Sequence, residues 1–218
     1  MDVAPRQIPR SSLGLMTTGL VGGWLTGSAF AVMLLTLILA VTQAGRGDIG
    51  LDLQMSAGVL VLLAGFVWVG GMVCSVIGWF GIAALHGSAR IIAWLGILVL
   101  SLAVLLPMSA GALNLGGARA FASLGVLVGV GFYVVQATFW ARHGTARGLA
   151  RLALTGAILA AASGLVALLT IWTGTGGPEP LVIVAVFAGP TGGLMAHLGS
   201  GLAIGRERET VRALLTFE

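Results

Sequence analysis

The sequence predicts an all-α integral membrane protein, folded as a compact bundle of about six transmembrane helices. Of its 218 residues, 58% are hydrophobic and 8% are charged, whereas about a quarter of the residues in a soluble domain are charged. Apolar stretches recur along the whole chain, and each reaches the roughly 20 residues that a helix needs to cross a bilayer. The 35 glycines suit helices that approach one another closely in lipid. We therefore expect lipid to be the main solvent of a single membrane domain.

Six apolar stretches alternate with short polar or glycine-rich links. The predicted spans are, in chain order, Thr18–Val41, Ala57–Leu85, Ile91–Leu113, Phe121–Ala141, Leu152–Thr173 and Leu181–Gly205. The links between them are Gln43–Ser56, His86–Arg90, Asn114–Arg119, Arg142–Arg151 and Gly174–Pro180. The first span is too long for the apolar region of a signal peptide, so we expect it to be permanent. Residues 1–17 are then a cytoplasmic tail, 18–205 the membrane domain, and 206–218 an amphipathic cytoplasmic tail.

The arginines predict the orientation of the bundle. With both termini inside, nine of the eleven arginines lie on the cytoplasmic side, and Arg46 and Arg119 lie outside. The nine are Arg6, Arg10, Arg90, Arg142, Arg147, Arg151, Arg206, Arg208 and Arg212. This matches the positive charge of inner loops in membrane proteins. The abundance of Arg, Ala and Gly also suggests a bacterial genome rich in G and C, so we expect a multi-pass protein of the bacterial inner membrane.

The composition excludes several chemistries. All eleven basic residues other than histidine are arginine, which excludes mechanisms that need a Schiff-base lysine. The single cysteine, Cys74, excludes an intramolecular disulfide and a thiolate metal cage. No charged residue lies deep in a predicted span, which disfavours an ion-coupled pump. The arginines are spread beside apolar runs, a pattern of membrane topology and not of nucleic-acid binding. We expect a non-enzymatic protein without a metal or a cofactor.

A pentapeptide occurs twice, each time between the end of one span and the start of the next. The two copies are His86–Arg90 and His143–Arg147, with the sequences His-Gly-Ser-Ala-Arg and His-Gly-Thr-Ala-Arg. One interpretation is structural, because glycine ends a helix, Ser or Thr caps the next one, and histidine suits the negative end of a helix. The other is functional, with the side chains converging on an anion or a shared haem b. The residues concerned are His86, Arg90, His143 and Arg147. The repeat also suggests helical hairpins related by duplication.

His197 lies inside the last predicted span, between Gly193 and Gly201. Ionisable residues inside a membrane are rare and often functional. A neutral histidine packed and hydrogen-bonded between helices is one interpretation; ligand contact, proton transfer and haem ligation are the others. Small residues that recur at helical spacing predict faces for helix packing. These packing glycines are Gly19, Gly23, Gly27, Gly125, Gly129, Gly193 and Gly201.

Pro190 is expected to kink or break the same span, because proline lacks a backbone N–H and clashes with the preceding turn. Transporters use discontinuous helices near the midplane to expose backbone groups to a solute. Pro107 offers a weaker counterpart in the third span. This interpretation places a transport path beside Pro190, Thr191 and His197.

The string Ala196–Gly201, followed by Gly205, resembles the last-helix motif of the rhomboid intramembrane proteases, in which the histidine activates a serine. The resemblance implies that His197 would be the base of a protease. A rhomboid also carries its serine in a Gly-x-Ser-Gly string, at the start of an earlier helix that is separated from the histidine helix by another span. The closest string here, Ala161–Gly164, lies in the adjacent span. The chain therefore departs from the rhomboid motif in residue, depth and order.

Two functional hypotheses remain. The first is a non-enzymatic inner-membrane protein that serves as a subunit or accessory of a larger assembly, through contacts of its glycine-rich faces with partner helices or a second copy. The second is a small-solute permease or channel that uses the last span around Pro190 and His197. An intramembrane protease and a haem-containing oxidoreductase subunit are the enzymatic alternatives. In every case the lipid bilayer is the first partner.

Overall fold

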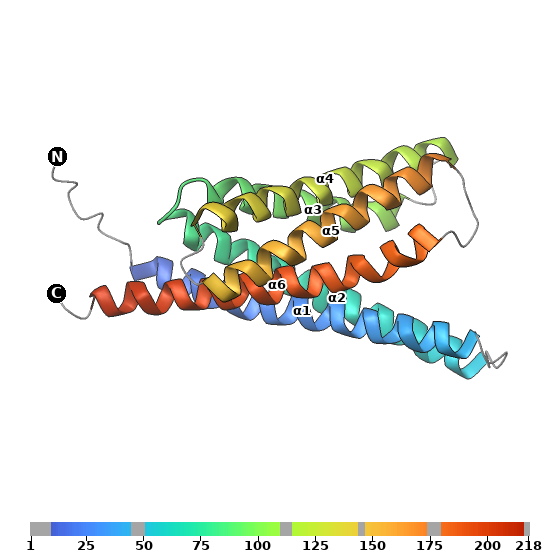
Figure 1. Cartoon of the computed structure of the whole chain (residues 1–218), viewed down its shortest axis with the longest axis horizontal. Coiled ribbons are helices and arrows are strands. Elements are labelled where there is room, and N and C mark those ends of the chain that lie inside the picture. The colour runs from blue at the N-terminus through green and yellow to red at the C-terminus, as the bar shows by residue number, and fades with distance from the viewer. Residues whose placement is uncertain (1–9, 45–50, 110–114, 144–146, 174–179, 216–218) are drawn as a thin grey trace.

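The computed structural model describes residues 10–44, 51–109, 115–143, 147–173 and 180–215. This part of the chain forms six α-helices and no strand, which confirms the prediction of an all-helical protein. The helices are α1 (Arg10–Ala44), α2 (Leu51–Ala83), α3 (Ala89–Ser109), α4 (Leu115–His143), α5 (Arg147–Thr173) and α6 (Pro180–Leu215). They run back and forth along the long axis of the molecule (Figure 1).

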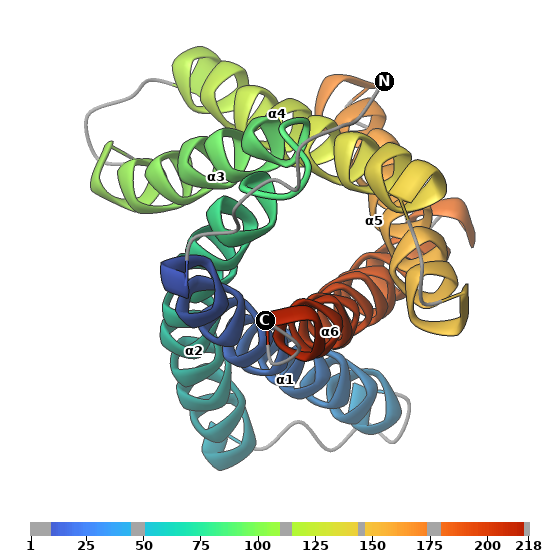
Figure 2. The same cartoon turned by 90° about the vertical axis from the view of Figure 1, so that its left-hand side faces the viewer.

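The six helices form a ring. Each helix packs against the next one in the chain, and α6 closes the ring by packing against α1 (Figure 2). Large side chains fill the inside of the ring at one end of the molecule, where α1 begins and α6 ends. The largest of those that are fully buried are Trp79, Phe132, Met16, Met72, Ile82, Ile92 and Ile204.

Five helical stretches are long and apolar enough to cross a membrane, which supports a multi-pass membrane protein. They are Ser11–Gln43, Gly58–Ala83, Arg119–His143, Gly148–Thr173 and Ile183–Ala213. The corresponding apolar stretch of α3, Ala89–Leu105, is shorter. Large apolar side chains point outward, and Phe66 is 70% exposed and Leu169 is 64% exposed. In water such a surface would be strongly unfavourable, whereas in a bilayer it contacts acyl chains.

Glycines bring α1, α2, α5 and α6 into backbone contact. A Cβ added at Gly23 of α1 would lie 2.6 Å from the Cα of Gly201 on α6, and one at Gly199 would lie 2.5 Å from the backbone nitrogen of Ala153 on α5. No side chain fits at these distances. The contacts join α6 tightly to both of its neighbours, as small residues do in membrane bundles.

Several predicted boundaries are wrong. The link predicted at Gln43–Ser56 is largely helical, because α1 continues to Ala44 and α2 begins at Leu51. Helix α4 begins at Leu115, inside the link predicted at Asn114–Arg119. The C-terminal tail predicted from residue 206 is a direct continuation of α6 up to Leu215. Residues 1–9, 216–218 and the Gly174–Gly177 part of the last link, together with Arg6 and Arg46, lie outside the described residues.

The break predicted at Pro190 is also absent, since α6 is continuous through this residue. Proline cannot donate a backbone hydrogen bond to the preceding turn. Ser163 of α5 donates a hydrogen bond of 2.7 Å to the carbonyl oxygen of Ala185, and Thr191 donates one of 2.8 Å to that of Phe187. Hydroxyl groups of the same and the neighbouring helix thus satisfy carbonyl groups around the proline, as is common in membrane helices.

Candidate functional site

His197 projects from α6 into the ring and is 3% exposed. Two rings stack on its imidazole: Phe30 of α1, at 5.7 Å between centroids and 16° between planes, and Phe132 of α4, at 6.1 Å and 19°. Tyr133 of α4 approaches with its edge, and its hydroxyl oxygen lies 3.3 Å from Nε2 of His197. Three aromatic rings from two helices, α1 and α4, therefore surround one polar side chain of α6.

On the side of this layer that is nearer the termini, further polar side chains connect α4 to α6 across the inside of the ring. Gln136 donates from Nε2 to the hydroxyl oxygen of Ser200 and, at 3.5 Å, to the carbonyl oxygen of Ala196. Trp140 donates from Nε1 to the same Ser200 oxygen at 2.9 Å. Residues 133, 136 and 140 follow the helical spacing of three and four, so all three point to one side of α4. The polar ladder connects two helices that are not neighbours in the ring.

The ladder leaves one acceptor without a partner. The Oε1 atom of Gln136 is buried and makes no hydrogen bond with any residue of the described segments. Buried polar atoms in proteins are nearly always hydrogen-bonded, so such an atom is a place where water or a bound molecule donates. Gln136 thus combines full burial with a free acceptor.

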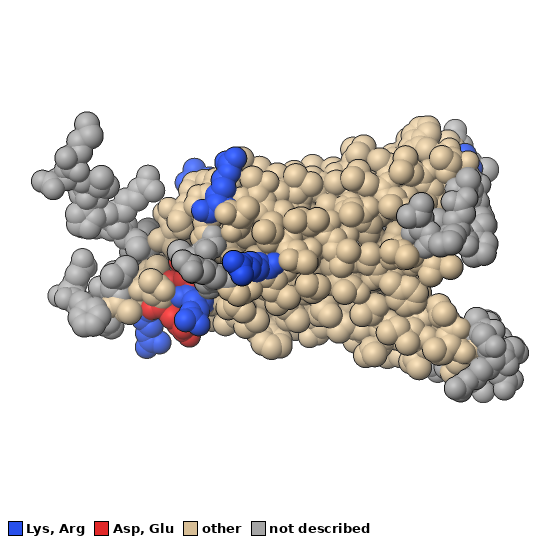
Figure 3. Space-filling model, in the orientation of Figure 1, with Lys and Arg blue, Asp and Glu red and all other residues tan. Residues whose placement is uncertain are grey.

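On the side of the His197 layer away from the termini, glycines leave free space beside α4 and α2. Gly125 and Gly129 lie on the same face of α4 as Phe132 and Gln136, at spacings of three, four and seven residues. A Cβ at either glycine would meet no atom within 4 Å. The same holds for Gly65 of α2. Figure 3 shows a recess in the outline of the molecule at this end.

The inside of the ring is closed toward the other end. Trp79 of α2 packs edge-on against Phe139 of α4 at 5.2 Å between ring centroids, and against Trp140 at 5.6 Å. All three rings are at most 5% exposed. His197 therefore lies between the free space beside Gly125 and Gly129 and the sealed layer at Trp79.

The two histidines of the repeated pentapeptide converge at the sealed end. The rings of His86 and His143 are 4.8 Å apart between centroids and tilted by 48°, and His143 stacks on Phe139. Burial and the neighbouring His143 lower the pKa of His86, while Glu207 of α6 acts in the opposite direction. Because the two imidazoles touch, they cannot ligate opposite faces of one haem in this arrangement. Within the described segments, no group of three or more His, Cys, Asp or Glu side chains is placed to hold a metal ion.

The other predicted site residues are distributed over the molecule. Arg90 is exposed at the start of α3, and the side chain of Arg147 is not among those that the structure describes. Ser163 bonds to the α6 backbone while His197 contacts Tyr133, so these two do not form the pair that a rhomboid needs. Five of the predicted packing glycines lie against another helix or its side chains, namely Gly19, Gly23, Gly27, Gly193 and Gly201. At Gly125 and Gly129 a Cβ would meet no atom of the described segments within 4 Å.

Sequence reasoning missed the polar contacts between α4 and α6, in which Tyr133 meets His197 while Gln136 and Trp140 bond to Ser200. Tyr133, Gln136 and Trp140 have the spacing of one helical face, and this signal is visible in the sequence. Glu207 was expected in a solvated tail but contributes to the electrostatics of His86. The fold and the site together define a multi-pass α-helical membrane protein with a buried polar layer inside a helix ring. No known protein family, curated protein or solved structure matches the chain.

Proposed function

We propose that this chain is a non-enzymatic protein of the bacterial inner membrane, with six spans and both termini in the cytoplasm. Helix α3 has 21 residues, about 31 Å at 1.5 Å per residue, enough for the sixth span. Arginine side chains gather at the end of the molecule where the termini lie (Figure 3). Inner loops of membrane proteins carry the positive charge, so this end faces the cytoplasm.

We further propose that the ring is a permease or channel for a small uncharged solute, and that its half away from the termini is open to water. The observation that carries this function is the position of His197, between open space beside Gly125 and Gly129 and the sealed layer at Trp79. No charged side chain is buried among the residues that the structure describes. A charged solute would find no compensating charge there, whereas an uncharged hydrogen-bond donor suits the free acceptor of Gln136.

Filling the open space tests this function. Gly129→Leu should keep the protein folded, because its Cβ meets no atom within 4 Å, and should block the path. Gly131→Leu is the matched control, since Gly131 also has free space but lies on a different face of α4. We would measure the swelling of proteoliposomes in glycerol, urea and a short-chain alcohol by light scattering. The expected result is swelling with the unchanged protein and with Gly131→Leu, and its loss with Gly129→Leu. Equal rates for all three proteins and for protein-free liposomes would contradict the permease.

A subunit of a larger assembly is the second candidate, and the length of α6 favours it. Its 36 residues extend over about 54 Å, compared with a hydrocarbon layer of about 30 Å. The end of α6 packs against the bundle as far as Val211, which is buried, and presents Arg206 and Glu209 on its exposed side. In Figure 1 it extends to the end of the molecule where the termini lie. The native mass of the gently extracted protein distinguishes the candidates: other polypeptides in fixed proportion support the subunit, and this chain alone supports the permease.

A further inference from the structure

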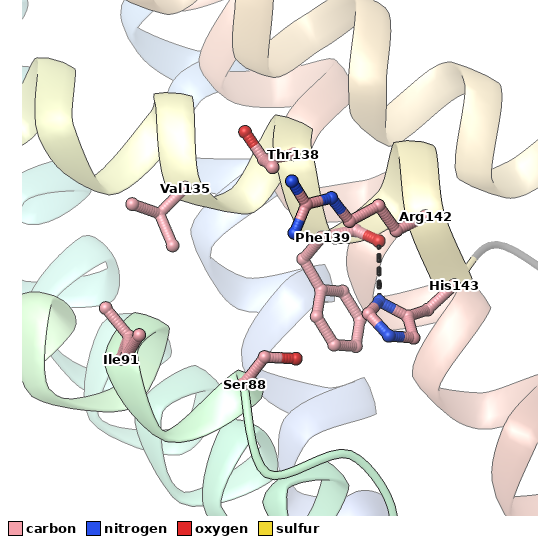
Figure 4. A pocket seen from close by; sticks show the side chains of 7 residues that line it. All are labelled: Ser88, Ile91, Val135, Thr138, Phe139, Arg142 and His143. Carbon is pink, nitrogen blue, oxygen red and sulfur yellow. Dashed lines mark hydrogen bonds between the residues drawn. The ribbon is translucent and has the colours of Figure 1, made fainter.

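A groove runs between α3 and α4 on the outside of the ring, near the end where the termini lie. It encloses about 190 Å³. Ile91, Val135 and Phe139 form its apolar wall, and Ser88, Arg142 and His143 lie at its end (Figure 4). Figure 4 shows Val135, Phe139, Arg142 and His143 following one another along α4, with Ile91 and Ser88 opposite them on or just before α3. The groove is separate from the His197 layer inside the ring.

The groove faces lipid and not the core. Ile91 is 56% exposed, and Thr138 and Arg142 are exposed as well. The apolar stretch of α4 that can cross a membrane ends at His143. The polar end of the groove therefore lies at the level of the lipid headgroups, and its apolar wall at the level of the first acyl carbons.

The polar end of the groove is positively charged. Arg142 contributes a full charge and up to five N–H donors, a geometry that matches a phosphate group. Ser88 adds a hydroxyl, and α3 begins beside it at Ala89, so the positive end of the helix dipole adds to the potential. The nearest described carboxylate, Glu207, is not part of the lining. It acts on His86, toward the inside of the ring.

We propose that this groove binds an anionic phospholipid of the inner leaflet. The phosphate group of the lipid contacts Arg142 and Ser88, and the first methylenes of an acyl chain lie on Ile91 and Val135. Basic pockets between membrane helices on the cytoplasmic side are known to bind anionic headgroups. A phospholipid fits better than a soluble phosphate, because the lining is mainly apolar and open to the bilayer.

Native mass spectrometry of the intact protein tests the proposal, with phosphatidylglycerol and phosphatidylcholine of the same acyl chains as probes. We expect the protein to retain phosphatidylglycerol in preference to phosphatidylcholine. In Arg142→Gln this preference should fall about fivefold, because one basic residue near an anionic surface contributes roughly 1 kcal/mol. Arg151→Gln is the matched control, since Arg151 is an exposed arginine at the same end but outside the groove. Arg142→Lys, which keeps the charge, should retain part of the preference.

Three outcomes would overturn the proposal. Equal retention of both lipids by the unchanged protein would show that only acyl chains bind. Equal preference in Arg142→Gln and Arg151→Gln would place the anionic lipid elsewhere. Displacement of the lipid by millimolar inorganic phosphate would identify a soluble anion as the ligand. The thermal unfolding midpoint of each variant, expected to match that of the unchanged protein because both arginines are exposed, excludes misfolding as the cause of a loss.

Discussion

At the scale of single residues, the inside of the ring is organised by hydrogen bonds between uncharged groups. His197, Tyr133, Gln136 and Ser200 are buried or partly buried, and within the described segments their hydrogen bonds go to one another, to Trp140 and to the backbone of Ala196. In a medium of low dielectric constant, a neutral network of this kind avoids the large cost of a buried charge. The same network positions the free acceptor of Gln136 inside the ring.

Ser200 is the shared partner in this network, and its removal should be measurable. Ser200→Ala leaves the buried N–H group of Trp140 without its acceptor and leaves Gln136 Nε2 with only the long bond to the carbonyl oxygen of Ala196. Because buried donors without partners cost roughly 1–3 kcal/mol, we expect a clearly lower midpoint of thermal unfolding in detergent. The control is Ser101→Ala, whose exposed hydroxyl bonds only to the carbonyl oxygen of Ile97 in its own helix. A midpoint as high as that of Ser101→Ala would mean that the ladder does not stabilise the fold.

At the scale of helices, the glycine contacts determine which pairs are tight. Helix α6 touches α1 and α5 backbone to backbone, whereas α3 meets its neighbours through side chains such as Val76, which contacts Gly96. Dispersion contacts between closely approaching backbones are a main source of stability between membrane helices. The backbone contacts of α6 with α1 and α5, like those between α1 and α2, should therefore be more sensitive to added volume than the contacts of α3.

Two glycines on the α1–α6 contact allow a direct comparison. In Gly23→Ala, the new methyl group would lie 2.6 Å from the Cα of Gly201, so the backbones must move apart. In Gly205→Ala, it would lie 3.2 Å from Cδ1 of Leu20, a flexible side chain that can shift. We expect Gly23→Ala to reduce the free energy of unfolding by roughly 1–3 kcal/mol, as overpacking does, and Gly205→Ala to change it little. Denaturation of both variants in mixed micelles measures the difference, and equal stabilities would argue against backbone contact at Gly23.

At the scale of the whole molecule, the sequence predicts the elements better than their assembly. Long apolar stretches identify helices because lipid requires about the same length from every span. The sequence predicted a break at Pro190 from the lost N–H group, whereas α6 is continuous there and bonds to Ser163 of another helix nearby, a contact between helices that the sequence does not show. The six-span count and the cytoplasmic termini remain predictions.

The site was less predictable than the fold, because its contacts join distant parts of the chain. Tyr133 and His197 are 64 residues apart, and His86 and His143 meet only once the ring has closed. The spacing of Gly125 and Gly129 equals that of Gly19 and Gly23. Gly125 and Gly129 face open space, whereas Gly19 and Gly23 each face another helix. This difference depends on the helices that lie nearby in space, which the local sequence does not reveal.

The central claim is that the ring is open to water on the side away from the termini, as far as His197. A nitroxide spin label at Gly129→Cys, in a Cys74→Ala background and in proteoliposomes, tests it by electron paramagnetic resonance, with Gly131→Cys as the control on another face of α4. The expected result is a mobile label at residue 129 that is reached by a water-soluble nickel chelate, while the label at residue 131 is reached mainly by oxygen from the lipid. An immobile label at residue 129, or one reached by oxygen alone, would contradict a path for solutes through the ring.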